Sequence, residues 1–407
     1  MEPILFLTHR IPFPPNKGDK VRSFHLLTFL AQRFRVHLGT FVDDAADRQF
    51  VARLDEYCAS SKVVEIHPAL ARIKSLTGFW TGEALTLSYY RDAALAAWVR
   101  DTVVRYRIRS ALVFSSAMAQ YIADIKGLRT VVDFVDVDSA KWEQYGRTRP
   151  WPLSAVYERE GDRLLSFERS VAKKTDASVF VTRGEADLFR KLAPESASRV
   201  SHAANGVDTD FFSPASQLAN PFPDDEEPIV FTGAMDYWPN IDAVCWFAQE
   251  VLPTIVSSRP NVRFYVVGMQ PSPAVLELAK DARIIVTGRV DDVRPYLQHA
   301  RVVVAPVRVA RGIQNKVLEA MAMGRPVVVS AAASAALSGE PGKDFEVAAD
   351  APLFAAKTLD LMDIDRGRRI GAAGRARVVA DYDWAVNLAP FVGLLDGAAT
   401  AHVDAGD

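Results

Sequence analysis

The first two hundred residues of the chain alternate short apolar runs with longer amphipathic stretches. The short runs are rich in β-branched residues and are predicted to be strands at Ile4–Thr8, Val36–Val42, Val63–Ile66, Ala111–Ser115, Thr130–Phe134 and Ala177–Val181. Between them, apolar side chains recur at helical spacing in Gly18–Arg33, Arg91–Arg107 and Tyr157–Lys174. Strands that alternate with helices indicate βα units and a parallel sheet.

A second series of the same kind begins after a break in the pattern at residues 205–228, which are rich in Asn, Pro and acidic residues. Its strands are predicted at Ile229–Thr232, Arg263–Val267, Ile284–Val286, Val302–Ala305 and Pro326–Val329, with a helix after each of the first four. We therefore predict an α/β protein with two Rossmann-like, doubly wound domains facing a cleft, residues 1–204 and 205–383. Residues 384–395 are predicted to be helical, and we expect the segment 384–407 to pack back on the first domain and end in an acidic tail.

Composition narrows the class of protein. With 407 residues, of which 49% are hydrophobic and 24% charged, the chain buries substantial cores, which excludes a disordered or collagen-like protein. The two cysteines, Cys58 and Cys245, fall in different predicted domains and cannot form a disulfide framework or a Cys-rich zinc site. The sequence has no run of 18 or more apolar residues and no signal-like start, so we expect a cytoplasmic location.

Charge is unevenly distributed along the chain. Residues 1–200 carry 30 Lys and Arg against 24 Asp and Glu, a balance of +6, so the remainder carries −8 of the total of −2. A positive first domain suits peripheral contact with anionic lipids at the inner face of the cell membrane, or a phosphorylated acceptor, and ordinary variation explains the asymmetry equally well. No basic stripe with interleaved aromatic residues is present, which argues against nucleic acid as a partner.

The most informative segment is Arg308–Pro326, which follows a predicted buried strand. A loop with Gly312 leads into a helix, whose free N-terminal amides suit an anion such as a diphosphate, and Lys316 adds a positive charge there. One turn farther along, the Glu319 carboxylate can accept hydrogen bonds from a ribose diol. The alternative is a capped helix whose Lys and Glu face water.

Several fragments resemble the second domain of retaining glycosyltransferases of the family 4 type, which have the two-domain GT-B fold. These fragments match in order and spacing and are Asn205–Asp208 with Phe211, Phe231–Gly233, Val266–Gly268, Val286–Val290 and Leu318–Val328. Two further segments, Thr8–Lys20 and Gly312–Lys316, resemble sugar transferases associated with bacterial exopolysaccharide and PEP-CTERM systems.

The resemblance implies transfer of a sugar, with retention, from a nucleotide diphosphate sugar to a polysaccharide or lipid-linked acceptor in exopolysaccharide synthesis. It implies no metal and no cofactor besides the donor substrate. Glu319 is then expected to hold the ribose and Lys316 to stabilise the leaving diphosphate. Further donor-binding positions are expected at Gly312, Ile313, Gln314, Asn315, Gly233, Gly268, Arg289 and Val290, and at Gly18 in the loop after the first strand, where glycine allows close approach of a substrate.

Two departures from the family pattern affect this reading. Family members usually carry a Glu eight residues before the position of Glu319, where this chain has Arg311. The family also tends to place an Arg and a Lys after the first strand of the second domain, but Ala234–Asn240 contains no cation. Arg311 and Lys316 are the natural substitutes, because a departing diphosphate needs positive charge.

A second candidate lies in Asp133–Ser139, at the end of a predicted strand. Strand alternation would put Asp136 and Asp138 on one face and Asp133 on the other. Asp138 or Asp136 is our candidate to orient or deprotonate an acceptor hydroxyl. Two rival interpretations are a metal-binding Asp-x-Asp of the single-domain glycosyltransferases, against which the two-domain pattern argues, and aspartates that cap turns and the next helix.

Two other functions stay open at this point. The same frame serves nucleotide-sugar epimerases, which need additional acid and base groups that the sequence does not reveal. A catalytically inactive sugar-nucleotide-binding subunit of a polysaccharide assembly is suggested by Arg311 at the position where the family expects Glu.

Overall fold

The computed structural model describes residues 1–15, 18–147, 150–310 and 313–397, which form two compact units. Unit 1 comprises Met1–Ala204 together with the chain from Leu388 onward, and unit 2 comprises Asn205–Asn387. The short helix α17 (Trp384–Leu388) carries the chain from unit 2 back to unit 1.

Unit 1 contains a sheet of seven parallel strands in the order β3-β2-β1-β4-β5-β6-β7. The strands are β1 (Pro3–Thr8), β2 (Arg35–Val42), β3 (Cys58–Glu65), β4 (Ser110–Phe114), β5 (Arg129–Val135), β6 (Ala177–Phe180) and β7 (Val200–His202). The chain first builds outward from β1 and then returns to place β4 on its other side. This reversal creates the switch point beside which doubly wound proteins bind ligands.

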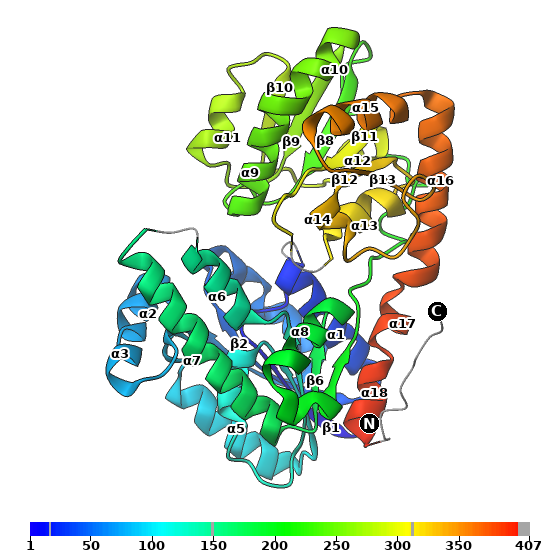
Figure 1. Cartoon of the computed structure of the whole chain (residues 1–407). Helices are drawn as coiled ribbons and strands as arrows, with labels where there is room; N and C mark the ends of the chain where they lie inside the picture. The colour runs from blue at the N-terminus through cyan, green and yellow to red at the C-terminus, as the bar shows by residue number, and fades with distance from the viewer. Residues whose placement is uncertain (16–17, 148–149, 311–312, 398–407) are drawn as a thin grey trace. The chain divides into compact units, whose positions relative to one another are not determined.

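Helices cover both faces of this sheet (Figure 1). The buried residues of α5, α7 and α8 share one apolar cluster with the strands, while α18 packs on β4 and β5 near α1, with the Arg22 guanidinium 5.9 Å from the Phe391 ring. The α-helices of unit 1 are α1 (Gly18–Ala31), α2 (Pro68–Ser75), α3 (Gly78–Thr81), α4 (Leu85–Tyr89), α5 (Ala93–Tyr106), α6 (Asp138–Arg147), α7 (Leu153–Lys174), α8 (Arg183–Leu192) and α18 (Pro390–Asp396). Short 3₁₀ segments are η1 (Ala45–Glu56), η2 (Ser116–Tyr121) and η3 (Pro194–Arg199).

Unit 2 contains six parallel strands in the order β10-β9-β8-β11-β12-β13. They are β8 (Glu227–Thr232), β9 (Val262–Val267), β10 (Ile284–Gly288), β11 (Val302–Ala305), β12 (Val327–Ser330) and β13 (Glu346–Ala348). The helices are α9 (Trp238–Trp246), η4 (Phe247–Val251, a π-helix), α10 (Leu252–Ser258), α11 (Pro273–Leu278), α12 (Arg294–His299), α13 (Asn315–Ala322), α14 (Ala331–Ser334), α15 (Ala351–Leu361) and α16 (Ile364–Asp381).

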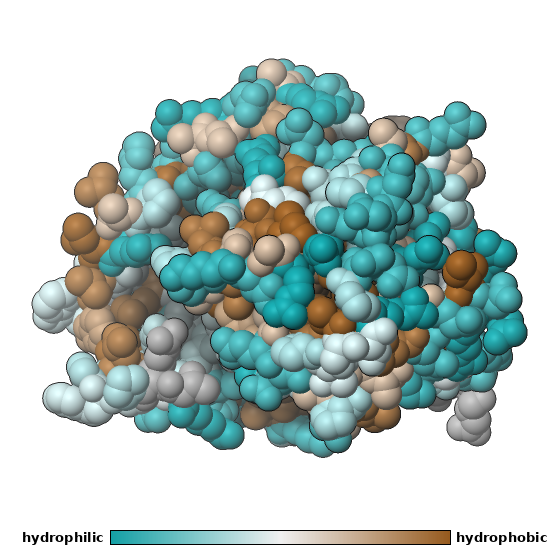
Figure 2. Space-filling model, turned by 90° about the horizontal axis from the view of Figure 1, so that it is seen from above, coloured by the Kyte–Doolittle hydropathy of each residue, from teal (hydrophilic) through white to brown (hydrophobic). Residues whose placement is uncertain are grey.

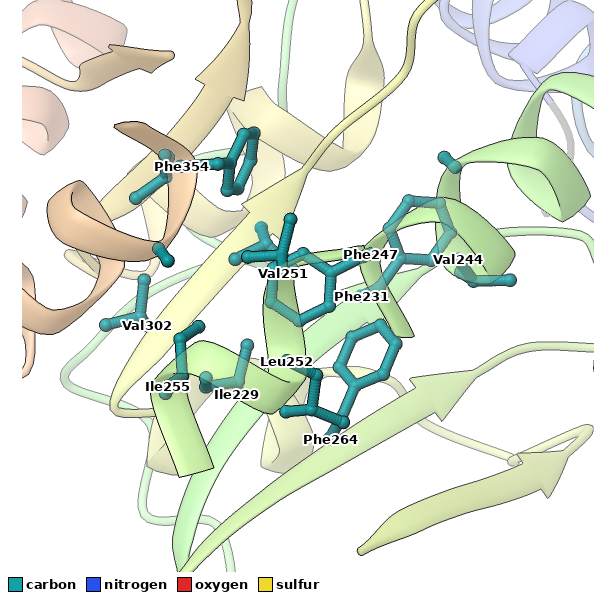
Figure 3. Packing of buried hydrophobic residues seen from close by; sticks show 14 of the residues in the cluster. Ile229, Phe231, Val244, Phe247, Val251, Leu252, Ile255, Phe264, Val302 and Phe354 are labelled. Carbon is teal, nitrogen blue, oxygen red and sulfur yellow. The ribbon is translucent and has the colours of Figure 1, made fainter. Parts of the chain in front are cut away.

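Successive residues of the central strands of unit 2 enter two different cores. Phe231 joins Phe247, Phe264 and Phe354 on the face covered by α9, α10 and α15 (Figure 3). Its neighbour Val230 enters the other core, with buried residues of α12, α13 and α16. Burial on both faces explains why these strands are continuous apolar runs rather than alternating ones.

Several details differ from the expected elements. Strand β3 begins at Cys58, five residues before the predicted start. The three-residue edge strands β7 and β13 were not predicted, because three residues are too few to show a period. The expected helical stretch 384–395 is interrupted and forms α17 and α18, since Pro390 lacks the amide hydrogen that would continue a helix through it.

Within the described residues, the segment Ile364–Asp396 is long enough and apolar enough to cross a membrane by length and composition alone, as core helices of soluble proteins also are. Helix α16 carries four Arg residues between positions 366 and 375 and buries Ile370 and Val378 in the cores of unit 2, as a core helix does.

Candidate functional site

Helix α13 begins in unit 2 at the carboxyl end of the sheet, after β11. Gln314 occupies the N-cap position with an extended backbone, and its side chain makes no capping hydrogen bond. The first amides of a helix point out of its N-terminus and carry a partial positive charge. The start of α13 can therefore receive an anion, and binding of a diphosphate there stays a prediction.

Lys316 is held in place at this helix start. Its Nζ donates a 2.6 Å hydrogen bond to Oδ1 of Asn240 and lies 4.1 Å from the centroid of the Phe231 ring. Nδ2 of Asn240 in turn donates to the carbonyl of Ala234 at 2.8 Å, so the amide orientation is set. Asn240 was not predicted as a site residue, because the segment Ala234–Asn240 was considered only for its lack of an Arg or Lys. The available signal was a polar side chain in the first turn of a helix that follows a buried strand.

Two glycines bring the ends of β8 and β9 together beside Lys316. Gly233 has φ of 155° and Gly268 has φ of 158°, a region that residues with a Cβ atom rarely adopt. A Cβ atom at Gly268 would lie 1.7 Å from the carbonyl oxygen of Gly233. A Cβ atom at Gly233 would lie 2.9 Å from Nζ of Lys316 and 2.8 Å from Nδ2 of Asn240. Space as well as conformation thus requires glycine at position 268, whereas a Cβ atom at position 233 would displace the side-chain ends of Lys316 and Asn240.

Glu319 lies one turn beyond Lys316 on α13. Burial lowers the pKa of Lys316 to about 7 and raises the pKa of Glu319 to about 7, and each charge partly opposes the shift of the other. No residue that the structure describes donates a hydrogen bond to the Glu319 carboxylate. A partly buried carboxylate without a protein donor suits a ligand that supplies hydroxyl groups.

The other expected donor-binding positions of unit 2 gather at the same edge of the sheet. Ile313 and Gln314 directly precede α13, and Asn315 begins it and accepts a 3.3 Å hydrogen bond from Asn205. Arg289 and Val290 follow β10, with Arg289 exposed and Val290 packed against a core. Arg311 and Gly312 lie outside the described residues.

Unit 1 brings the two candidate catalytic aspartates together through a lysine. Nζ of Lys141 lies 2.7 Å from Oδ2 of Asp136 and 3.1 Å from Oδ1 of Asp138. The reasoning from strand alternation was wrong, because β5 ends at Val135, where φ is 69°, and Asp138 already begins α6. Lys141 was not predicted, although its position three residues after Asp138 is the spacing of a helical ion pair.

Buried polar groups support these aspartates. Glu168 accepts hydrogen bonds from the amide and the hydroxyl of Ser139, and burial raises its pKa to about 8. Burial acts to lower the pKa of Lys141, but the nearby carboxylates of Asp138 and Asp136 outweigh this effect and raise that pKa. Asp133 pairs instead with the fully buried Arg22 at 2.7 Å, so its role is structural.

The loop after β1 leads into α1 at Gly18. Asp19 lies inside the first turn of α1 rather than at an N-cap, and its carboxylate contacts His9 at 3.3 Å and Arg10 at 3.0 Å. Among the described residues, no group of three or more His, Cys, Asp or Glu side chains is arranged to hold a metal ion.

Two comparisons identify the family, and two similar solved structures identify the fold. Residues 226–363 match the family model described as "Glycosyl transferases group 1". Alpha-maltose-1-phosphate synthase from Mycolicibacterium smegmatis is 30% identical over 265 residues, which cover 58% of this chain and 67% of that protein. Sucrose-phosphate synthase from Thermosynechococcus elongatus superposes with a TM-score of 0.73 at 17% identity, over 98% of this chain and 99% of that one. HepE from Anabaena, solved with UDP-glucose, superposes with a TM-score of 0.67 at 16% identity, over 98% of this chain and 100% of that one.

The two parallel sheets with helices on both faces define an α/β protein of the GT-B class. The chain belongs to the group 1 glycosyl transferases, and it is a glycosyltransferase.

Proposed function

We propose that this enzyme transfers a sugar, with retention of anomeric configuration, from a nucleotide diphosphate sugar to a polysaccharide or lipid-linked acceptor in exopolysaccharide synthesis, without a metal. The observation that carries the proposal is the arrangement at the start of α13, where Lys316 is held by Asn240 beside uncapped amides and Glu319 lies one turn away.

The diphosphate of the donor would lie against the amides of α13 and Nζ of Lys316. Negative charge accumulates on the diphosphate as the sugar bond breaks, and donors already in position stabilise that charge without reorganising. The Glu319 carboxylate would accept hydrogen bonds from the ribose diol. Arg311 would supply further positive charge in place of the Glu usual at that position.

The acceptor hydroxyl would be oriented or deprotonated by Asp138 or Asp136 of unit 1. Lys141 holds both carboxylates beside the start of α6, where either one can accept a hydrogen bond from a hydroxyl group.

A thermal-shift panel tests the donor site first. UDP, GDP, ADP and CMP would each be added with magnesium or with EDTA, because a nucleotide that binds the folded state must stabilise it. We expect one nucleotide to raise Tm whether or not EDTA is present, and the shift to become much smaller in Glu319→Ala and Lys316→Met. UDP-glucose is the first donor to test, since HepE was solved with it. No shift with any nucleotide would refute the donor site.

Turnover then separates the enzymatic outcomes. Donor consumption that requires a membrane or polysaccharide extract, with a product whose anomeric configuration matches the donor by NMR, supports retaining transfer. Release of free nucleotide and an altered sugar without an acceptor would mean an epimerase. Nucleotide binding with no donor consumption would mean a binding subunit.

A further inference from the structure

Unit 1 exposes five large apolar side chains along one short segment. They belong to α2, α3 and the turn between them, and their exposed fractions lie between 43% and 85%; this α2–α3 patch consists of Leu70, Ile73, Leu76, Phe79 and Trp80. Figure 2 shows hydrophobic side chains at the left edge, the side on which α2 and α3 are drawn in Figure 1. Soluble proteins rarely expose so many large apolar side chains close together unless a partner covers them.

The packing of α2 does not require these residues. The helix buries only the small side chains Ala71 and Ser75 and lies beside α4. Leu70, Ile73 and Leu76 recur every three residues on the exposed side, so the larger apolar groups face away from unit 1. This orientation is the reverse of what a helix that only covers a core would show.

Lys and Arg predominate around the patch. Arg72 and Lys74 are exposed on α2, residues 67–82 contain no Asp or Glu, and Glu83, which follows them, is paired with Arg91 at 2.9 Å. The guanidinium of Arg159, from α7, lies 4.8 Å from the centroid of the Phe79 ring and adds a third cation at the rim. Apolar and aromatic side chains flanked by Lys and Arg are the composition of surfaces that lie at a lipid interface.

The patch also lies at the edge of unit 1 that holds the two candidate aspartates. Helix α2 follows the carboxyl end of β3, and the segment with Asp136 and Asp138 follows the carboxyl end of β5 in the same parallel sheet. We infer that unit 1 docks on an anionic lipid bilayer through the α2–α3 patch, with the apolar side chains in the headgroup region and the cations on lipid phosphates. The inference goes beyond the proposed function and needs no donor; a lipid-linked acceptor would reach this edge from the bilayer.

Vesicle co-sedimentation of the full chain tests the inference. We expect binding to phosphatidylcholine vesicles that contain phosphatidylglycerol, and much weaker binding to phosphatidylcholine alone or at high salt. Replacing both cations in Arg72→Gln/Lys74→Gln should weaken binding about 30-fold, since each cation near the surface contributes about fivefold. Ile73→Ser/Trp80→Ser should weaken it about 100-fold by removing two apolar anchors. The matched control is Val104→Ser, which changes a side chain of unit 1 that is 78% exposed on α5.

The depth to which Trp80 enters the bilayer is measured with brominated lipids, which quench tryptophan fluorescence on contact. Quenching should be lost in Trp80→Phe while binding is kept, because Phe is still an aromatic anchor. The inference is overturned if wild-type protein does not bind anionic vesicles or if Ile73→Ser/Trp80→Ser binds as tightly as wild type. It is also overturned if ultracentrifugation shows a lipid-free dimer that Ile73→Ser/Trp80→Ser dissociates, since the patch would then join two copies. Nucleotide thermal shifts in the same variants report the donor site separately.

Discussion

Nζ of Lys316 and Oδ1 of Asn240, 76 positions apart in the chain, are joined by a 2.6 Å hydrogen bond. The bond connects the first turn of α13 to the first turn of α9, two helices that follow the neighbouring strands β11 and β8. A lysine at a helix start would otherwise sample many rotamers. Holding its charge in one place before the ligand arrives reduces the entropy lost on binding.

Replacing Asn240 should therefore weaken donor binding. In Asn240→Ala the ammonium loses its partner, and a hydrogen bond to a charged group contributes about 1.5–3 kcal/mol, so we expect nucleotide affinity to fall about 10- to 100-fold. Calorimetric titration measures the change, with the exposed Asn261→Ala as the control. Unchanged affinity in Asn240→Ala would mean that the bond does not position the lysine for a ligand.

Nucleotide affinity should show two opposed pH limbs that meet near pH 7. Burial lowers the pKa of Lys316 to about 7, so the charge that attracts a diphosphate is present below pH 7 and is lost as pH rises. Burial raises the pKa of Glu319 to about 7, so the ionised acceptor for a diol is gained as pH rises. Titrations from pH 5.5 to 9 should show only the rising limb in Lys316→Met and only the falling limb in Glu319→Gln. A flat profile in wild type would contradict both assignments.

Replacing Gly268 should mainly reduce stability, whereas replacing Gly233 should mainly reduce nucleotide binding. In Gly268→Ala the new Cβ atom would meet the Gly233 carbonyl at 1.7 Å, so we expect a loss of about 3 kcal/mol or more in the free energy of unfolding. In Gly233→Ala the new atom would press on Lys316 and Asn240, so nucleotide binding should fall more than stability does. Gly393→Ala is the control, because a Cβ atom there meets nothing within 4 Å and alanine favours the helix by about 1 kcal/mol.

The aspartate pair of unit 1 should act on transfer and not on donor binding. We expect Asp138→Asn to lower kcat about 100-fold or more, the usual effect of losing a general base, with an unaltered nucleotide thermal shift. Lys141→Met removes the cation that lies 2.7 Å from Asp136 and 3.1 Å from Asp138, and it should also lower kcat without altering the nucleotide thermal shift. If only Asp136→Asn reduces kcat, the base is Asp136.

The ion pair of Arg22 with Asp133 should matter for stability alone. Their side chains are 1% and 0% exposed, and removing one partner of a buried pair typically costs about 3–5 kcal/mol. Urea denaturation should show this loss in Asp133→Asn and in Arg22→Met, and a smaller loss than their sum in Arg22→Met/Asp133→Leu. The exposed pair of Arg48 and Glu65 is the control, where Glu65→Gln should change stability by less than about 1 kcal/mol.

The order of strands and helices could be predicted from the sequence because hydrophobic periodicity is a local property. Runs such as Val302–Ala305 are long enough and apolar enough to mark a buried strand, and the helix that contains Lys316 and Glu319 follows one directly. The same locality explains the failures: β7 and β13 have three residues each, and Val135 turns the chain out of β5 before the pattern of alternating residues ends.

Which side chains meet was decided by the tertiary structure. Sheet order places β8 beside β11, and only that neighbourhood brings Asn240 to Lys316 and the Gly233 backbone to both. Likewise, the start of α6 gathers Asp136 and Asp138 around Lys141, and α7 supplies Glu168 beneath them. The sequence alone thus determined the elements and the residue types at their ends, since propensity and period act over a few neighbouring residues. The partners of those residues depend on strand pairing between distant segments, which no local pattern encodes.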